Sequence, residues 1–147
     1  MKLGIFKIKN KHTFKMIKIN QFFKLFLLSL KRKQSENNYI KFQKFQANLI
    51  LNELKQKKIN YREGKFLELG CGKGGYSLSF IKEVNDFSAA DISVPKLILD
   101  KNKDINFIQF NFEKQFPIKN EIYDTIFCAS VIEHIKNKNN FLREIKR

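Results

Sequence analysis

One ten-residue run, residues 66–75, constrains the fold of this chain more than any other stretch. It reads FLELGCGKGG, an apolar strand that breaks into a turn with glycine at alternate positions. Gly70, Gly72 and Gly74 lack the Cβ atoms that would disfavour a positive φ and keep a small ligand away from the main chain. A helix beginning near Gly75 would direct its first N–H groups, at the positive end of its dipole, toward such a ligand. The run therefore predicts a strand, a ligand-binding turn and a helix in succession.

The chain beyond this turn alternates short apolar strands with helical segments. Such alternation is typical of a parallel sheet with right-handed crossover helices. Ser93 is the expected N-cap of one of these helices, with Pro95 in its first turn. The predicted fold class is α/β, with a Rossmann-like, mostly parallel sheet and flanking helices. We expect strands over 65–69, 87–90, 106–110 and 124–129, and helices over 76–84, 93–101 and 141–147.

The chain ends soon after the fourth expected strand. Residues 125–129 would then form an edge with unpaired backbone groups, because no later strand covers them. We therefore expect a domain that is incomplete at its C-terminus. Two explanations stay open: a partner chain covers the edge of the fourth strand, or the sequence is a truncated or split fragment.

The residues before the turn divide into two parts. Residues 1–34 mix Lys with isolated apolar residues, and we expect a basic N-terminal arm with a short helix around 17–30. Ser35 is a suitable N-cap, and apolar residues recur behind it at helical spacing to about residue 58. The expected organisation is this arm, an N-terminal cover helix within 35–62 and a ligand-binding domain over 63–147.

The net charge of the chain is strongly positive and unevenly placed. There are 29 Lys and Arg against 14 Asp and Glu, and residues 1–62 hold 16 of these basic residues with only Glu36 and Glu53 as acids. A basic segment can contact nucleic-acid phosphates, or an anionic membrane surface through an amphipathic helix with Phe22 and Phe26 on one side. Compositional bias is the alternative, since Lys, Asn, Ile and Phe are abundant while Trp and Pro are scarce. No RNA-binding module signature accompanies the charge, and we favour bias over a dedicated nucleic-acid surface.

Two cysteines and one apolar run bear on location. Cys71 and Cys128 show neither metal-binding spacing nor a disulfide framework, which favours a reducing, cytoplasmic location. The most apolar N-terminal run, residues 22–28, is far shorter than the roughly 20 residues of a membrane-spanning helix. No small-residue cleavage site follows it, so we expect no signal peptide. We expect a single soluble domain.

Asp91 closes the second expected strand, at the carboxyl edge where open α/β sheets bind ligands. A carboxylate there can accept hydrogen bonds from both ribose hydroxyls of a nucleoside. The turn also satisfies G-x-G-x-x-G through Gly70, Gly72 and Gly75, so an NAD-dependent oxidoreductase fragment is an alternative. Glu68 argues against it, because a carboxylate so close to the turn would approach a pyrophosphate. A P-loop is excluded, since the lysine of the turn is followed by glycine rather than Ser or Thr.

Four segments of residues 64–147 match, in order, the motifs of one enzyme family. The motif E-x-G-x-G-x-G is complete over residues 68–74, and the acidic residue after the second strand is Asp91. Asn111 stands where the third motif usually has Asp. The motifs D-x-E-x-x-x-P, F-D with apolar residues, and E-H correspond to NFEKQFP at 111–117, YDTIF at 123–127 and Glu133-His134. The chain thus resembles the class I S-adenosylmethionine-dependent methyltransferases, near the branch of ubiquinone and biotin-pathway enzymes.

This resemblance implies S-adenosyl-L-methionine as cofactor and the strand order 3-2-1-4 of the family's fold. Glu68 would lie near the cofactor's amine, Asp91 would hold the ribose, and Asn111 would face the adenine amino group. Phe112 would form an apolar wall, and the segment after the fourth strand would pass beside the methionine part. The implied cofactor-binding residues are Glu68, Gly70, Cys71, Gly72, Gly74, Asp91, Ile92, Asn111, Phe112, Ala129 and Ser130.

The implied reaction is methyl transfer to a small-molecule, lipid or sugar acceptor. Much of the acceleration can come from holding the acceptor about 3 Å from the methyl group and in line with it. His134 is the only histidine near the expected site, and it is the candidate base for an acceptor that must lose a proton. The alternative is that Glu133 and His134 only order the loop after the fourth strand.

The same residues bear on metal binding and on a non-enzyme function. In quinone O-methyltransferases this stretch reads E-x-x-E-H and can hold a divalent metal, whereas here it reads SVIEH. Because the first carboxylate is missing, we expect no firmly bound metal. The non-enzyme alternative is an inactive methyltransferase-like remnant, or a binding module that uses the basic N-terminal arm.

Overall fold

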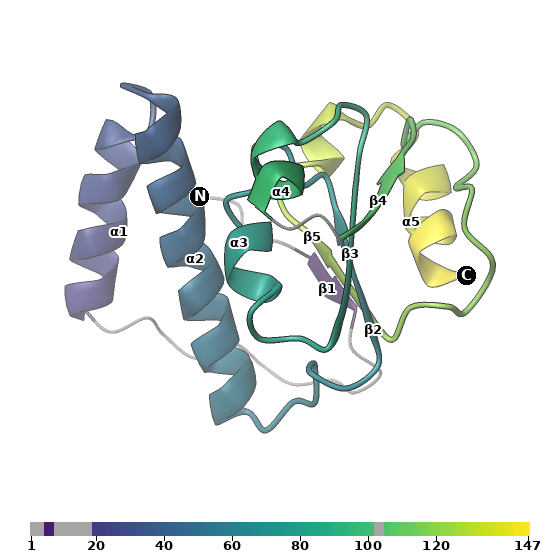
Figure 1. The fold of residues 1–147 in the computed structure, drawn as a ribbon, viewed down its shortest axis with the longest axis horizontal. Coiled ribbons are helices and arrows are strands. Elements are labelled where there is room, and N and C mark those ends of the chain that lie inside the picture. Colours follow the sequence, from purple (N-terminus) through teal and green to yellow (C-terminus); the bar gives the residue numbers. More distant parts are fainter. Residues whose placement is uncertain (1–4, 8–18, 102–104) are drawn as a thin grey trace.

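The computed structural model of this protein describes residues 5–7, 19–101 and 105–147, and its core is a five-stranded sheet in the order β1-β5-β2-β3-β4 (Figure 1). β2 lies in the middle and pairs in parallel with both β3 and β5, and β3 pairs in parallel with β4. Counted along the chain from β2, these four strands lie in the order 3-2-1-4 that the resemblance implied. The strands are β1 (Ile5–Lys7), β2 (Lys65–Leu69), β3 (Asp86–Asp91), β4 (Asn106–Gln109) and β5 (Thr125–Cys128).

The edge of β5 is paired with the chain's own N-terminal segment. β1 runs antiparallel to β5, with Ile5 opposite Cys128 and Lys7 opposite Ile126. The expectation of an unpaired fourth strand was therefore wrong at these positions. β1 is only three residues long and lies in a lysine-rich segment without a sustained period, so no strand was expected there. A partner strand could pair with β5 here only by displacing β1.

Two antiparallel helices stand beside the sheet (Figure 1). α1 (Ile19–Lys31) packs on α2 (Glu36–Gln56), with Leu25 buried between them. The Ser35 hydroxyl caps α2 by accepting a hydrogen bond of 3.2 Å from the Asn38 N–H, which confirms the expected start of this helix. Among the described residues, no helix combines the length and the apolar character needed to cross a membrane.

The crossover helices are shorter than expected. α3 (Ser77–Phe80) is a single turn, after which i to i+3 and i to i+4 hydrogen bonds carry the chain to Val84 without a regular helix. α4 (Lys96–Lys101) begins three residues after Ser93, so the expectation of Ser93 as its N-cap was wrong. The Ser93 hydroxyl and N–H both donate to Asp91 instead. A 3-10 turn (Ile132–His134) and α5 (Lys138–Lys146) complete the described chain.

Aromatic side chains fill the core on both faces of the sheet, as expected of a parallel sheet covered on two sides. On the side of α2 and α3, Phe66, Phe80 and Phe127 form contacts with ring centroids 4.7–5.1 Å apart. On the side of α5, Phe112 and Phe141 belong to a second cluster that also buries Leu67 and Leu69. The central strand is thus held rigidly, and so is the turn that follows it.

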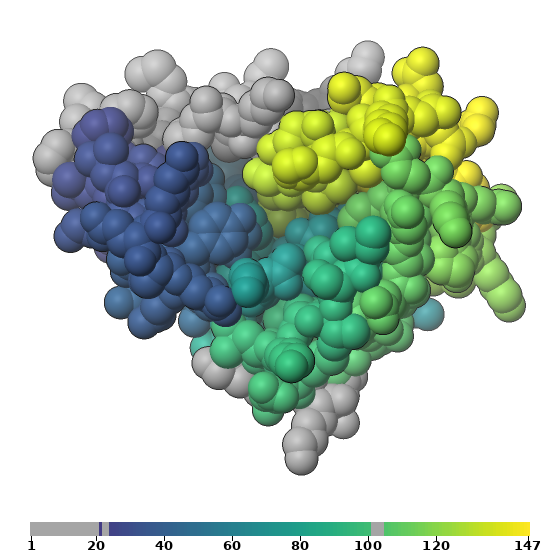
Figure 2. Space-filling model, turned by 90° about the horizontal axis from the view of Figure 1, so that it is seen from above, coloured from purple at the N-terminus to yellow at the C-terminus, as the bar shows by residue number. Residues whose placement is uncertain are grey.

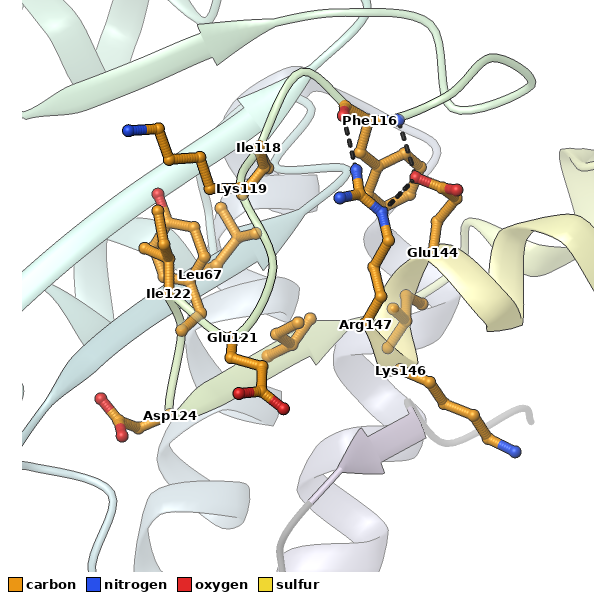
Figure 3. Close-up of a pocket in the computed structure, with 13 residues that line it drawn as sticks. Leu67, Phe116, Ile118, Lys119, Glu121, Ile122, Asp124, Glu144, Lys146 and Arg147 are labelled. Atoms are coloured by element: carbon orange, nitrogen blue, oxygen red, sulfur yellow. Dashed lines mark hydrogen bonds and ion pairs between the residues drawn. The ribbon is translucent and has the colours of Figure 1, made fainter.

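A cavity of about 230 Å³ lies on the α5 side, between this helix and the loop that precedes β5 (Figure 3). Asp124 lines it just before β5 begins, so the cavity lies toward the amino end of that strand, away from the glycine turn. Arg147 closes one side by donating to the Phe116 carbonyl at 2.7 Å and to Glu144 Oε2 at 2.8 Å. The same Glu144 oxygen accepts from the Phe116 N–H at 2.9 Å.

Candidate cofactor-binding site

The three alternate glycines of the turn adopt the expected positive φ, but the space around each of them differs. Gly70, Gly72 and Gly74 have φ of 77°, 52° and 82°. A Cβ on Gly70 would collide with the Val131 side chain, and one on Gly74 would collide with Ile98. A Cβ on Gly72 would meet no atom within 4 Å. Gly70 and Gly74 therefore allow close packing, whereas Gly72 presents bare backbone to open space.

The turn lies at the carboxyl end of β2, and Figure 2 looks down on this end of the molecule. The start of α2 (dark blue), the turn and its surroundings (teal) and the segment after β5 (yellow-green) surround a hollow there. Gly72 and Lys73 are exposed, whereas Gly74 and Gly75 are buried. The exposed half of the turn is thus the part that a ligand can reach.

Asp91, at the end of β3, holds the turn in shape. Its Oδ2 accepts from the Gly72 N–H at 2.8 Å, and its Oδ1 accepts from the Ser93 N–H at 3.0 Å and the Ser93 hydroxyl at 3.2 Å. The Gly70 and Cys71 N–H groups donate to the Ala90 carbonyl, at 2.8 and 3.2 Å. Because the Gly72 amide is bound to a carboxylate, it does not offer the free donor that a dinucleotide pyrophosphate would need.

Glu68, in β2, is the most unusual titratable group of the site because it is only 1% exposed. Its Oε2 accepts from the Ser77 hydroxyl at 2.6 Å, and its Oε1 has no partner among the described residues. Burial raises the pKa of Glu68 to about 8, with a smaller contribution from the charge of Asp91, and the Ser77 hydrogen bond opposes the rise. A buried carboxyl with one unpaired oxygen is a strong acceptor for a donor brought by a ligand.

The loop after β4 contributes less freely than expected. Asn111 Oδ1 accepts from the Glu113 N–H at 2.9 Å, so this oxygen already shapes the loop. Phe112 is buried, and its Cε2 lies 3.8 Å from the place where a Cβ on Gly70 would stand. Ile92, beside Asp91, leaves a large apolar side chain exposed. The structure brings Ile92 and Phe112 to the same end of the sheet as the turn, and their contact with a cofactor stays a prediction.

The segment after β5 carries the remaining candidates. Ala129 is half-buried, and Ser130 is exposed with a φ of 56°, a left-handed conformation that is uncommon for a non-glycine residue and often marks a functional loop. Glu133 and His134 are exposed on the 3-10 turn that follows. Within the described ranges no three His, Cys, Asp or Glu side chains gather closely enough to hold a metal ion. A role for His134 in catalysis stays a prediction.

Cys71, in the glycine turn, and Cys128, at the end of β5, are buried free thiols. Burial raises the pKa of Cys71, as do the nearby charges of Glu68 and Asp91. Burial also raises the pKa of Cys128, to about 12. Both thiols therefore stay protonated at neutral pH, and neither is a nucleophile.

The cover helix contributes polar contacts that sequence reasoning missed. Lys73 Nζ lies 3.0 Å from Glu36 Oε2, and the Tyr76 hydroxyl donates to Gln46 Oε1 at 2.7 Å. Between them, the buried Gln43 packs against Gly75, where a Cβ would collide with its side chain. The only available signal was the recurrence of polar residues at 36, 39, 43 and 46 on a helix that otherwise buries apolar groups.

The sheet order, the glycine turn and the two carboxylates that flank it define the class: a class I S-adenosylmethionine-dependent methyltransferase domain. A protein from Methanococcus maripaludis that is described as an S-adenosyl-L-methionine-dependent methyltransferase shares this fold. The TM-score is 0.59 over 93% of this chain and 62% of that chain, at 18% identity. The YcgJ protein from Bacillus subtilis gives a TM-score of 0.53 over 63% of this chain and 43% of that chain, at 23% identity.

Sequence comparison gives the family directly. Residues 67–147 match the family described as a methyltransferase domain, and the chain belongs to it. Pavine N-methyltransferase from Thalictrum flavum subsp. glaucum is 27% identical over 108 residues, which cover 68% of this chain and 30% of that protein. The chain thus spans less than a third of this relative's length.

Proposed function

We propose that this chain is the cofactor-binding part of an enzyme that uses S-adenosyl-L-methionine as its methyl donor. The observation that carries the proposal is the unpaired Oε1 of the buried Glu68, next to the turn in which Gly72 faces open space. A buried acceptor without a partner lowers the stability of the free protein and suits a donor from a ligand. The ammonium of the cofactor's methionine part is such a donor, so the residues present fit the cofactor that the family uses.

Asp91 is the proposed ribose ligand. A carboxylate offers about four lone-pair positions, and the hydrogen bonds from Gly72 and Ser93 use three of them. One position on Oδ2 is left for a ribose hydroxyl, rather than room for two. The exposed Ile92 follows directly and offers apolar surface to the adenine, with Phe112 as the second apolar contact.

The chemistry that such a site supports is methyl transfer by in-line displacement. The bound cofactor supplies an activated methyl group, and the residues of this chain bind and orient it. A small-molecule, lipid or sugar acceptor fits this chemistry. The relative named pavine N-methyltransferase supports the small-molecule class among these three. Where the acceptor must lose a proton, the exposed His134 is the proposed base.

Calorimetric titration with S-adenosylhomocysteine tests the cofactor assignment. We expect the parent chain to bind and Asp91→Ala and Gly72→Val to bind at least about tenfold more weakly, the first by loss of a charged acceptor and the second by filling the open face. Asp86→Ala is the matched control, because Asp86 is an exposed carboxylate at the opposite end of the same strand. Equal binding by the parent and both site variants would show that the assignment is wrong.

The oxidoreductase alternative has its own measurement. An NADH titration followed by cofactor fluorescence should show no saturable binding, because Asp91 already accepts from the Gly72 amide and Glu68 lies beside the turn. Saturable NADH binding by the parent chain would favour the oxidoreductase alternative instead.

We also propose that α1 rests on an anionic membrane surface. Phe26, Leu27 and Leu30 are 50%, 43% and 60% exposed, although Leu25 on the same helix is buried against α2. Lys24 and Lys31 are exposed beside them. Residues 19–62 hold ten Lys and Arg against two Glu, so charge complementarity favours an anionic lipid surface over a neutral partner.

Vesicle sedimentation tests this proposal. We expect binding to vesicles of phosphatidylglycerol and phosphatidylcholine, and little to phosphatidylcholine alone. Replacing Phe26, Leu27 and Leu30 with Ser should abolish binding, and Lys24→Gln with Lys31→Gln should weaken it. Absence of vesicle binding, together with RNA binding that the Ser substitutions leave unchanged, would overturn the membrane assignment in favour of nucleic acid.

A further inference from the structure

Gln43 is a buried amide that the protein satisfies at one end only. The side chain is 7% exposed, and its Nε2 donates to the Tyr39 hydroxyl at 3.2 Å. Its Oε1 has no partner among the described residues and lies against Gly75 of the glycine turn. If the amide is turned over, the Tyr39 hydroxyl can donate to the oxygen, and the NH₂ group then faces Gly75 unpaired. In either orientation one polar end lacks a partner at the turn.

The position of Gln43 is fixed by its neighbours on the same helix. The Glu36–Lys73 ion pair lies about two helical turns before it, and the Gln46–Tyr76 hydrogen bond lies one turn after it. Both contacts join α2 to the turn, so Gln43 is held over Gly75 from either side. Its unpaired end is therefore a feature of the docked helix rather than of a loose surface side chain.

Gln43 and Glu68 stand at the two ends of the turn. Three buried side-chain atoms of the described residues lack a partner, and two of them are Gln43 Oε1 and Glu68 Oε1. Tyr76 follows Gly75, and its pKa is raised by burial, with smaller contributions from Tyr39 and Glu68. Two unpaired acceptors that flank one turn suit a ligand group with several donors.

We propose that Gln43 of the cover helix binds the amino-acid end of the cofactor together with Glu68, an inference that rests on the proposed function of the turn. An ammonium has three N–H donors, and Glu68 Oε1 and Gln43 Oε1 can each accept one. With the amide turned over, Gln43 donates to the carboxylate of the same end group. The cover helix is then part of the cofactor site and not only a cover.

The test compares two ligands that differ in the amino-acid end. S-adenosylhomocysteine carries it, and 5′-methylthioadenosine lacks it. We expect Gln43→Leu to weaken S-adenosylhomocysteine binding by about tenfold or more and methylthioadenosine binding less than about twofold, because one hydrogen bond to a charged group is lost only with the first ligand. Gln46→Leu is the matched control, since the Gln46 oxygen is already bound to Tyr76 and should affect neither ligand differentially.

The outcomes separate this inference from the proposed function. Equal weakening of both ligands by Gln43→Leu, or no weakening of either, overturns the role of Gln43 while the turn keeps its cofactor. Failure of the parent chain to bind either ligand overturns the proposed function and this inference with it. Thermal unfolding should show Gln43→Leu at least as stable as the parent, because it removes an unpaired buried group. If that variant does not fold, Gln43→Met repeats the comparison with an unbranched side chain.

Discussion

The Asp91 carboxylate accepts a hydrogen bond of 2.8 Å from the Gly72 amide, so the end of β3 sets the shape of the turn after β2. Removal of this acceptor should loosen the turn even without ligand. We expect Asp91→Ala to lower the free energy of unfolding by about 1–2 kcal/mol, because Gly72 and Ser93 both lose a charged acceptor. Urea unfolding of this variant and of the Asp86→Ala control measures it. A loss of the same size in the control would contradict the role of Asp91.

The glycines of the turn should differ in their tolerance of a side chain. Gly74→Ala should destabilise the fold by about 2–4 kcal/mol, because φ is 82° and the new Cβ collides with Ile98. Gly72→Ala should cost only about 1 kcal/mol, the price of a left-handed alanine in open space. Thermal unfolding of both variants measures the two losses of stability. Equal losses would mean that the two glycines share one role.

The parts of the fold that were predicted correctly are those with a strong local signal. The glycine run after an apolar strand specified β2 and its turn, and Ser35 specified the start of α2. The structure places Glu68 and Asp91 beside that turn, and their contact with a cofactor stays a prediction. Local residue chemistry therefore predicted the strand, the turn and the helix start that surround the candidate site.

The features that the sequence did not predict depend on contacts between distant parts of the chain. β1 is visible only through its pairing with β5, because three residues cannot show a period. Ser93 has the chemistry of an N-cap, but its N–H and hydroxyl bind the Asp91 carboxylate at the end of β3, and α4 begins three residues later. In the sequence, Gln43 is one polar residue on a helix. Its side chain lies against Gly75, which comes more than thirty residues later in the chain.

Arg147 should contribute measurably to stability through the loop beside the cavity. Its guanidinium binds Glu144 and the Phe116 carbonyl, and Glu144 is largely shielded from solvent. Arg147→Ala is expected to lower the free energy of unfolding by about 1–2 kcal/mol, since the Glu144 carboxylate loses a charged partner. Arg143→Ala is the control, because Arg143 is exposed on the same helix. The two variants should leave S-adenosylhomocysteine binding unchanged, as the cavity lies away from the turn.

The buried Glu68 should make the folded state less stable as the pH rises. Its pKa is about 8 in the folded chain and 4.5 as a free side chain, so the folded state retains a proton that the unfolded state has lost. Its stabilising contribution is complete below pH 4.5 and is lost as the pH rises through 8. Glu68→Gln cannot titrate, and its stability should fall less over this window. Urea unfolding of both proteins at pH 5 and pH 8.5 tests this expectation. An equal change in unfolding free energy between the two pH values in both proteins would contradict it.

The same carboxyl should release its proton when the cofactor binds. At pH 7 a group with a pKa of about 8 is mostly protonated, and an ammonium placed beside it favours the carboxylate. Binding of S-adenosylhomocysteine should therefore release up to about one proton per site, which the buffer takes up. Calorimetry in phosphate and in Tris reports this as a difference in apparent enthalpy, because the two buffers differ in ionisation enthalpy. The difference should vanish in Glu68→Gln and should be absent with 5′-methylthioadenosine, which carries no ammonium. Proton release that persists in Glu68→Gln would place the titrating group elsewhere.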